Sequence, residues 1–220
     1  MNYFQLLKRL YDIYDRNVGK TVDAKYITRQ VRQAIPFSEC TITSIQTLSI
    51  ANNQFEVAGM YDSEADEYGE KCITVEIAFP AIKPEFVFCE SDLSRDHWSQ
   101  FCIDFALIVG HEYMHLNQFR RRDFKWSREY KSKHPAPKVR EVQRYYGDAD
   151  EIDAYAFTAA AEMAINFIPE NKKPIIETTP LYQTYTKYFD KQDPVVLKFV
   201  KLTERYFKRL ERQYHATKFE

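Results

Sequence analysis

Two histidines and a glutamate in the stretch IVGHEYMHLNQF (residues 108–119) are the side chains of this sequence best suited to do chemistry. In a helix, His111 and His115 lie one turn apart on the same face, so both imidazoles can reach one tetrahedral metal ion. Glu112 lies beside them, where its carboxylate can act as a general base toward water. The H-E-x-x-H pattern therefore predicts a zinc (Zn2+) site, with Glu112 as its catalytic residue.

The apolar residues around this motif predict that it faces the interior of the protein. They form one stripe of a helix that leads into the motif and continues after it: Trp98, Phe101, Phe105, Ile108, Leu116 and Phe119. Polar groups carried into such surroundings are costly without partners, and a metal ion supplies a partner. The alternative is a pair of core histidines bonded to backbone groups, with Glu112 paired to an arginine.

A catalytic zinc ion needs a third protein ligand, and the segment GDADEIDAYAFTAAAEM (residues 147–163) is the best candidate to supply it. Glu151 is followed on nearby helical turns by small side chains that allow close helix packing. Asp148 and Asp153 compete with Glu151 for this role. We expect Asp148 to cap the start of the helix, and Asp153 lies about 200° around the helix from Glu151.

At these residues the chain resembles the gluzincin metallopeptidases, particularly their small cytoplasmic members. HEYMH matches the family signature, and EIDAYAF is similar to the pattern of the third-ligand helix. The resemblance covers about residues 70 to 165. It implies that His111, His115 and Glu151 hold zinc, while Glu112 activates the water that attacks a peptide carbonyl. It also implies that the strand EFVFCE (residues 85–90) is the edge along which an extended substrate lies.

The chain departs from the family pattern beside the glutamate ligand. The family often has Asp or Asn four residues after that glutamate to orient a histidine, and this chain has Tyr155 there. Asp153 or the Tyr155 hydroxyl is expected to take over the orienting role. A further donor that stabilises the oxyanion is expected among five tyrosines: Tyr145, Tyr146, Tyr155, Tyr182 and Tyr185.

The elements expected around the motifs define an α+β fold. Amphipathic periodicity predicts helices over residues 2–16, 22–34, 94–122 and 148–167, then a short and a long helix after residue 180. Four β-rich segments between residues 41 and 90 predict a small, mainly antiparallel sheet. We therefore expect a zincin-like fold, with the sheet packed on the HExxH helix and the glutamate-ligand helix. The whole is expected to form one domain, residues 1–220, with a core at about 40–168 and helical extensions at 1–35 and 175–215.

The composition is that of an ordinary soluble protein, with 29% charged residues and a formal net charge of -1. No apolar run approaches the roughly 18 residues that span a bilayer, and the N-terminus has no signal-peptide pattern, so a cytoplasmic protein without a membrane partner is expected. The cysteines form no C-x-x-C pair and are expected to be free thiols: Cys40, Cys72, Cys89 and Cys102.

Residues 120–140 carry a local excess of positive charge. Nine Lys and Arg stand there against Asp123 and Glu129: Arg120, Arg121, Arg122, Lys125, Arg128, Lys131, Lys133, Lys138 and Arg140. A solvated loop explains this segment, and so does a patch for nucleic acid or an acidic partner, in which Trp126 and Tyr130 could stack on bases.

Two functions follow from these patterns. The first is a zinc metallopeptidase that hydrolyses peptide bonds of an intracellular protein. The alternative is a catalytically silent zincin-fold protein that binds nucleic acid or a protein partner through residues 120–140. Glu112 favours the enzyme, because a purely structural metal site needs no general base.

Overall fold

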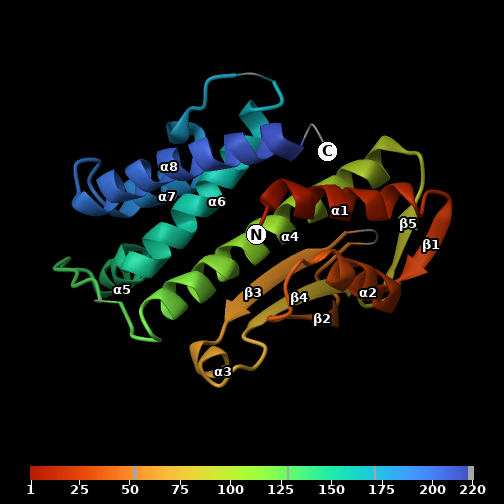
Figure 1. The fold of residues 1–220 in the computed structure, drawn as a ribbon, viewed down its shortest axis with the longest axis horizontal. Helices are drawn as coiled ribbons and strands as arrows, with labels where there is room; N and C mark the ends of the chain where they lie inside the picture. The colour runs from red at the N-terminus through yellow and green to blue at the C-terminus, as the bar shows by residue number, and fades with distance from the viewer. Residues whose placement is uncertain (52–53, 128, 171, 218–220) are drawn as a thin grey trace. The chain divides into compact units, whose positions relative to one another are not determined.

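The computed structural model describes residues 1–51, 54–127, 129–170 and 172–217 and shows an α+β protein rich in helices (Figure 1). The chain divides into two compact units, residues 1–116 and 117–220. The longest helix, α4 (Asp92–Arg121), contributes to both, because the boundary falls within it. The single domain expected from the sequence stays a prediction.

The first unit contains two small sheets, whereas the sequence predicted one. In the larger sheet, β4 (Ile73–Pro80) lies between β2 (Cys40–Thr47) and β3 (Glu56–Tyr61). β3 pairs antiparallel with β4, as expected, but β2 runs parallel to it. The second sheet pairs β5 (Glu85–Phe88) with β1 (Lys20–Asp23), a mostly exposed strand with no alternating pattern to predict it.

The helices of the first unit follow the predicted boundaries closely. α1 (Tyr3–Asp15) is capped by the Asn2 side chain, and α2 (Ala24–Ala34) is capped by Asp23, which is the last residue of β1. A short helix, α3 (Ser63–Glu67), occupies the acidic connection between β3 and β4. These caps satisfy backbone N–H groups that would otherwise lack partners at the helix starts.

An aromatic cluster joins α4 to both sheets. The Phe55 ring lies 5.5 Å from Phe79 of β4, 4.9 Å from Phe86 of β5 and 5.8 Å from Trp98 of α4, measured between centroids. The Trp98 indole donates a hydrogen bond of 3.1 Å to the Leu10 carbonyl of α1. Because Phe79, Phe86 and Trp98 are large and buried, they fix the rotation of α4 about its axis.

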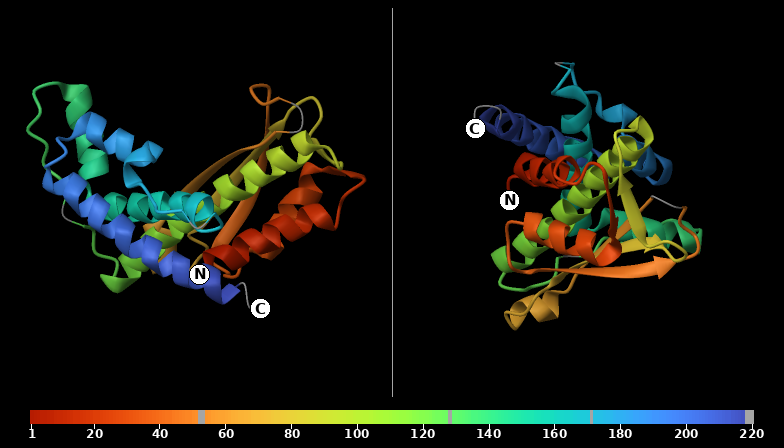
Figure 2. Two further views of the ribbon diagram at one scale, coloured as in Figure 1. Left: turned by 90° about the horizontal axis from the view of Figure 1, so that it is seen from above. Right: turned by 90° about the vertical axis from the view of Figure 1, so that its right-hand side faces the viewer.

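The second unit is helical. It contains α5 (Pro137–Gly147), α6 (Ala149–Phe167), the 3-10 turn η1 (Ile176–Thr178), α7 (Pro180–Tyr188) and α8 (Pro194–Thr217). α6 and α8 pack along each other (Figure 2), and the small buried side chains of α6 allow this close approach. α5 was not predicted, since its sequence is mostly polar. The Tyr185 ring of α7 stacks on the Phe199 ring of α8, with the ring centroids 4.3 Å apart.

Among the described residues, no helix is both long enough and apolar enough to cross a bilayer.

Candidate metal centre

The H-E-x-x-H motif lies in the middle of α4, as predicted, and its side chains point toward the interior. Glu112 and His115 are each 9% exposed, and His111 is half-buried. The residues of the predicted stripe are buried, apart from Ile108, which is half-buried: Trp98, Phe101, Phe105, Leu116 and Phe119. The helix therefore carries three polar side chains into largely dehydrated surroundings.

The two imidazoles face each other. The Nε2 atoms of His111 and His115 are 3.2 Å apart, and the ring planes are inclined by 77°. Two nitrogens bound about 2.05 Å from one tetrahedral zinc ion would lie about 3.3 Å apart. The observed separation fits a shared ion, although one ring donating a hydrogen bond to the other gives a similar distance.

Strand β3 lies against the Glu112 carboxylate. A Cβ atom added to Gly59 would be 2.4 Å from Cγ2 of Ile108 and 3.0 Å from both Cγ and Oε1 of Glu112. Farther along β3, the Tyr61 ring stacks on the His115 ring, with centroids 6.3 Å apart and planes inclined by 24°. Only glycine has room at position 59, so this backbone can approach Glu112 closely.

The strand that lies against Glu112 is β3 and not the one expected from the sequence to hold a substrate. The predicted edge, EFVFCE, is β5, which pairs with β1 in the separate sheet, and its proposed role stays a prediction. β3 is an edge strand of the larger sheet, and its residues are half-buried or exposed. The isolated glycine within a strand pattern was the sequence signal for a close backbone approach.

The second unit supplies the predicted third ligand, Glu151, from the first turn of α6, where it is half-buried. Asp148 caps this helix, as predicted, because its carboxylate accepts a hydrogen bond of 2.9 Å from the Asp150 backbone. The Ser127 hydroxyl donates to Asp148 at 2.8 Å. Asp148 is therefore engaged at the helix start, which leaves Glu151 as the better ligand candidate.

The start of α6 is anchored to the last turn of α4. The Gln118 amide donates to the Asp150 carbonyl at 3.0 Å and to the Asp153 carboxylate at 3.3 Å. Arg122 forms a two-pronged ion pair with Asp150, one contact of which is 2.6 Å. Sequence reasoning missed Gln118 and Arg122, because their partners are about thirty residues away in the chain.

The residues expected to orient the ligands have defined partners. Asp153 accepts hydrogen bonds from Gln118 and, at 2.8 Å, from the Tyr206 hydroxyl of α8. The Tyr155 and Tyr145 hydroxyls are 3.1 Å apart. Burial raises the pKa of Tyr145 to about 12, and the nearby Glu151 carboxylate contributes to the rise. Both phenols are therefore neutral donors at physiological pH.

The five tyrosines predicted as candidate oxyanion donors are spread over three helices of the second unit. Tyr145 and Tyr146 lie on α5, Tyr155 on α6, and Tyr182 and Tyr185 on α7. Tyr185 is fully buried, and burial raises its pKa. The role of oxyanion donor stays a prediction for these five residues.

The basic segment is divided among several environments. Arg120 and Arg121 end α4, and Lys138 and Arg140 lie on α5, whereas Arg122 is committed to the ion pair with Asp150. Arg128 lies outside the described residues. Trp126 is 77% exposed and meets Phe119 edge-on at 4.9 Å, whereas the Tyr130 side chain packs over Gly147. The nucleic-acid role of this segment stays a prediction.

The four cysteines are free, as predicted. Cys40, Cys72 and Cys102 are buried, and Cys89 is half-buried. Burial raises the pKa of Cys40 to about 12 and that of Cys102 well above its usual value. The Cys40 and Cys102 thiols are therefore poor metal ligands and poor nucleophiles.

His111 and His115 lie in the first unit and Glu151 in the second, so a metal site shared by the three side chains stays a prediction. No family model, curated protein or solved structure matches this chain. The candidate site is therefore judged on its residues and their geometry.

Proposed function

We propose that this chain is a zinc-dependent metallopeptidase that hydrolyses peptide bonds of a protein substrate. His111, His115 and Glu151 are the proposed ligands, and Glu112 is the proposed general base. The observation that carries the proposal is the 3.2 Å separation of the two histidine Nε2 atoms, with a buried carboxylate next to His111 in the same helix. Two imidazoles and one carboxylate are a donor set that suits zinc in catalytic sites.

The surroundings of the three α4 side chains support a catalytic role over a structural one. Zinc bound there would polarise a substrate carbonyl and lower the pKa of water. Glu112 is 9% exposed, so its carboxylate works in a medium of low polarity, where proton transfer and charge stabilisation are strong. Its proposed task is to take a proton from the attacking water and to deliver it to the leaving amine.

The third ligand is supported by contacts within the second unit. Gln118 follows His115 by one helical turn on α4, and its amide holds the backbone of Asp150, the residue before Glu151. The Arg122 ion pair with Asp150 strengthens the same attachment. The first turn of α6 is thus held by Gln118 and Arg122, which keeps the backbone at Glu151 in a defined position for the proposed ligand.

β3 is the proposed guide for the substrate. An extended peptide can add to the free edge of a sheet through backbone hydrogen bonds, and β3 is an edge strand. Gly59 lies against Glu112, so a peptide bond paired at this register would come close to the general base. Substrate side chains would then alternate between the two faces of the extended sheet.

The proposal is tested with Glu112→Gln, which keeps the size of the side chain but removes its basicity. We expect wild-type zinc content and a loss of hydrolysis of about 10²- to 10⁴-fold. The assay follows cleavage of a peptide library by mass spectrometry, with zinc measured on the same samples. Glu64→Gln, at an exposed position of α3, is the matched control. Full hydrolysis by Glu112→Gln, or loss of its zinc, would show that the role of Glu112 is misassigned.

A further inference from the structure

The two units carry charges of opposite sign. Residues 117–220 contain 21 Lys and Arg against 15 Asp and Glu, which gives a formal net charge of +6. Residues 1–116 contain 10 against 17, a net charge of -7. The near-neutral whole therefore conceals a basic unit, and such an asymmetry is typical of chains that bind a polyanion with one part.

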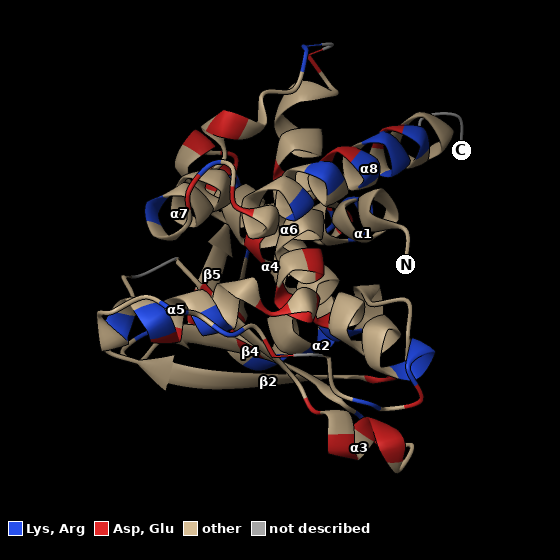
Figure 3. Ribbon diagram, turned by 90° about the vertical axis from the view of Figure 1, so that its left-hand side faces the viewer, with Lys and Arg blue, Asp and Glu red and all other residues tan. Residues whose placement is uncertain are grey.

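The positive charge of the second unit is ordered along α8. At about 100° per residue, six basic residues fall within an arc of about 100° on this helix and extend over about 21 Å of its length. All six are exposed, and Figure 3 shows Lys and Arg following the helix. They form what is called here the α8 stripe: Lys198, Lys201, Arg205, Lys208, Arg209 and Arg212.

The stripe is not neutralised by its surroundings. In the described part of the chain, none of the six side chains forms an ion pair. The acidic residues of α8, Glu204 and Glu211, lie on one margin of the stripe, about 40° or more outside it. Like charges at i, i+3 and i+4 destabilise a helix, so an ordinary solvated face favours mixed signs.

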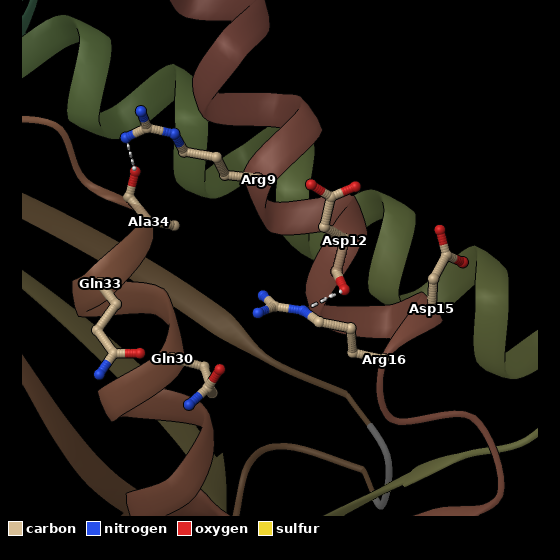
Figure 4. Close-up of a pocket in the computed structure, with 7 residues that line it drawn as sticks. All are labelled: Arg9, Asp12, Asp15, Arg16, Gln30, Gln33 and Ala34. Carbon is tan, nitrogen blue, oxygen red and sulfur yellow. Dashed lines mark hydrogen bonds between the residues drawn. The ribbon is translucent and has the colours of Figure 1, made fainter.

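Helix α1 shows the ordinary arrangement. Figure 4 shows Arg9 and Arg16 on this helix with Asp12 and Asp15 between them, beside a polar pocket of about 430 Å³. Arg9 and Arg16 donate to backbone carbonyls of Ala34 and Asp12. Charges of both signs are mixed there, so this face offers no continuous positive field to a large anion. The α8 stripe, in contrast, contains only positively charged side chains, and they follow one another along the helix.

We infer that the α8 stripe binds the phosphate backbone of double-stranded DNA. Duplex DNA presents one phosphate per about 3.4 Å on each strand, so a stripe of about 21 Å runs beside about six base pairs. The side chains are Lys and Arg, which form charge-assisted hydrogen bonds to phosphate oxygens. Contacts of this kind hold the duplex without reading its sequence.

Other polyanions fit the stripe less well. An amphipathic helix that lies on a membrane needs a free apolar face, and the apolar face of α8, which includes Phe199 and Phe207, is buried in the protein. Single-stranded nucleic acid is held by stacking on exposed aromatic rings, and the stripe contains none. Duplex RNA has a narrow, deep major groove, whereas that of DNA is wide enough to receive a helix face with phosphates on both sides.

The test measures binding of the full chain to a fluorescently labelled 20-base-pair DNA duplex by anisotropy between 50 and 300 mM NaCl. Six phosphate contacts predict a slope of about -5 in a plot of log K against log salt concentration. The variant Lys201→Gln/Arg205→Gln/Lys208→Gln/Arg212→Gln should reduce the slope to about -2 and weaken binding on the order of 10³-fold at 100 mM salt. Glu204→Gln/Glu211→Gln should tighten binding.

A matched variant removes four charges elsewhere in the same unit: Lys131→Gln/Lys133→Gln/Lys138→Gln/Arg140→Gln. It should keep the slope within about one unit of wild type. An equal loss in this variant would assign the binding to residues 120–140 and overturn the inference. So would the absence of salt-dependent binding, or equal binding of a duplex RNA, of polyglutamate or of anionic vesicles. Circular dichroism on each variant confirms that the exposed substitutions leave the fold intact.

Discussion

Gly59→Ala is the change that tests the contact between β3 and helix α4. The added Cβ would stand 2.4 Å from Cγ2 of Ile108 and 3.0 Å from Cγ and Oε1 of Glu112. Ordinary contacts between carbon atoms are about 3.5 to 4.0 Å, so the strand and the helix must separate by about 1 Å. Gly59 is not among the residues with positive φ, so alanine meets no backbone strain there and the effect is steric.

The magnitude follows from this displacement. Overpacking a well-packed contact lowers the free energy of unfolding by about 1 to 3 kcal/mol. Moving a general base by about 1 Å lowers the rate of hydrolysis about 10²-fold. Zinc affinity should change little, since the added atom contacts Glu112 and Ile108, neither of which is a proposed ligand. Thermal denaturation, zinc content and peptide cleavage are measured on the same preparation.

A second substitution separates stability from activity. Ile108→Ala, added to Gly59→Ala, removes the closest contact but leaves the one with Glu112. Gly59→Ala should therefore lower the free energy of unfolding less in the Ile108→Ala background than in the wild-type background. Hydrolysis by the double variant should stay low, because the contact with Glu112 remains. Ala58→Val, at the exposed neighbouring position, is the control and should behave like wild type. Wild-type stability and hydrolysis in Gly59→Ala would refute the proposed closeness of β3 and Glu112.

Two further predictions concern the second unit. Arg122→Ala and Asp150→Ala should each lower the free energy of unfolding by about 1 to 3 kcal/mol, since Asp150 is 7% exposed but Arg122 is partly screened by solvent. Urea titrations of both single variants and of the double variant should show non-additive losses of stability. Additive losses would mean that the two side chains are not coupled. Burial raises the pKa of Tyr145 and of Tyr206 to about 12 from an ordinary value of 10.0, so these groups favour folding below pH 10 and this contribution is lost as the pH rises from 10 to 12. Urea titrations at pH 9, 10 and 11 should show a fall in stability that is smaller in Tyr145→Phe/Tyr206→Phe than in the wild-type protein. An equal fall in the two proteins would contradict the assignment.

Local patterns in the sequence predicted the parts of the fold that depend on neighbouring residues. The periodicity of apolar residues located α4 and α6, and a short polar side chain at the start of α6 identified Asp148 as its cap. The two histidines one turn apart were likewise visible in the sequence, because one helix holds both. These features require no knowledge of distant partners.

Features that depend on distant pairing could not be predicted in the same way. β1 and β5 are separated by about sixty residues, and four mostly exposed residues of β1 give no signal for their partner. The parallel pairing of β2 with β4 is also non-local. The contact of Gly59 with Glu112 and the attachment of Gln118 to Asp150 arise only once separate segments pack together. The sequence therefore predicted the α4 motif but not the strand that lies against it.

The central claim is tested most directly by zinc affinity, measured by competition with a chelator on metal-free protein. The wild-type chain should bind one equivalent of zinc, and Glu151→Ala should bind it more weakly on the order of 100-fold or more while keeping its helical circular-dichroism spectrum. Asp148→Ala, the matched variant on the same helix, should keep its zinc and lose only about 1 kcal/mol of stability. Absence of zinc binding by the wild-type chain, or loss of zinc from Asp148→Ala but not from Glu151→Ala, would contradict the proposed site.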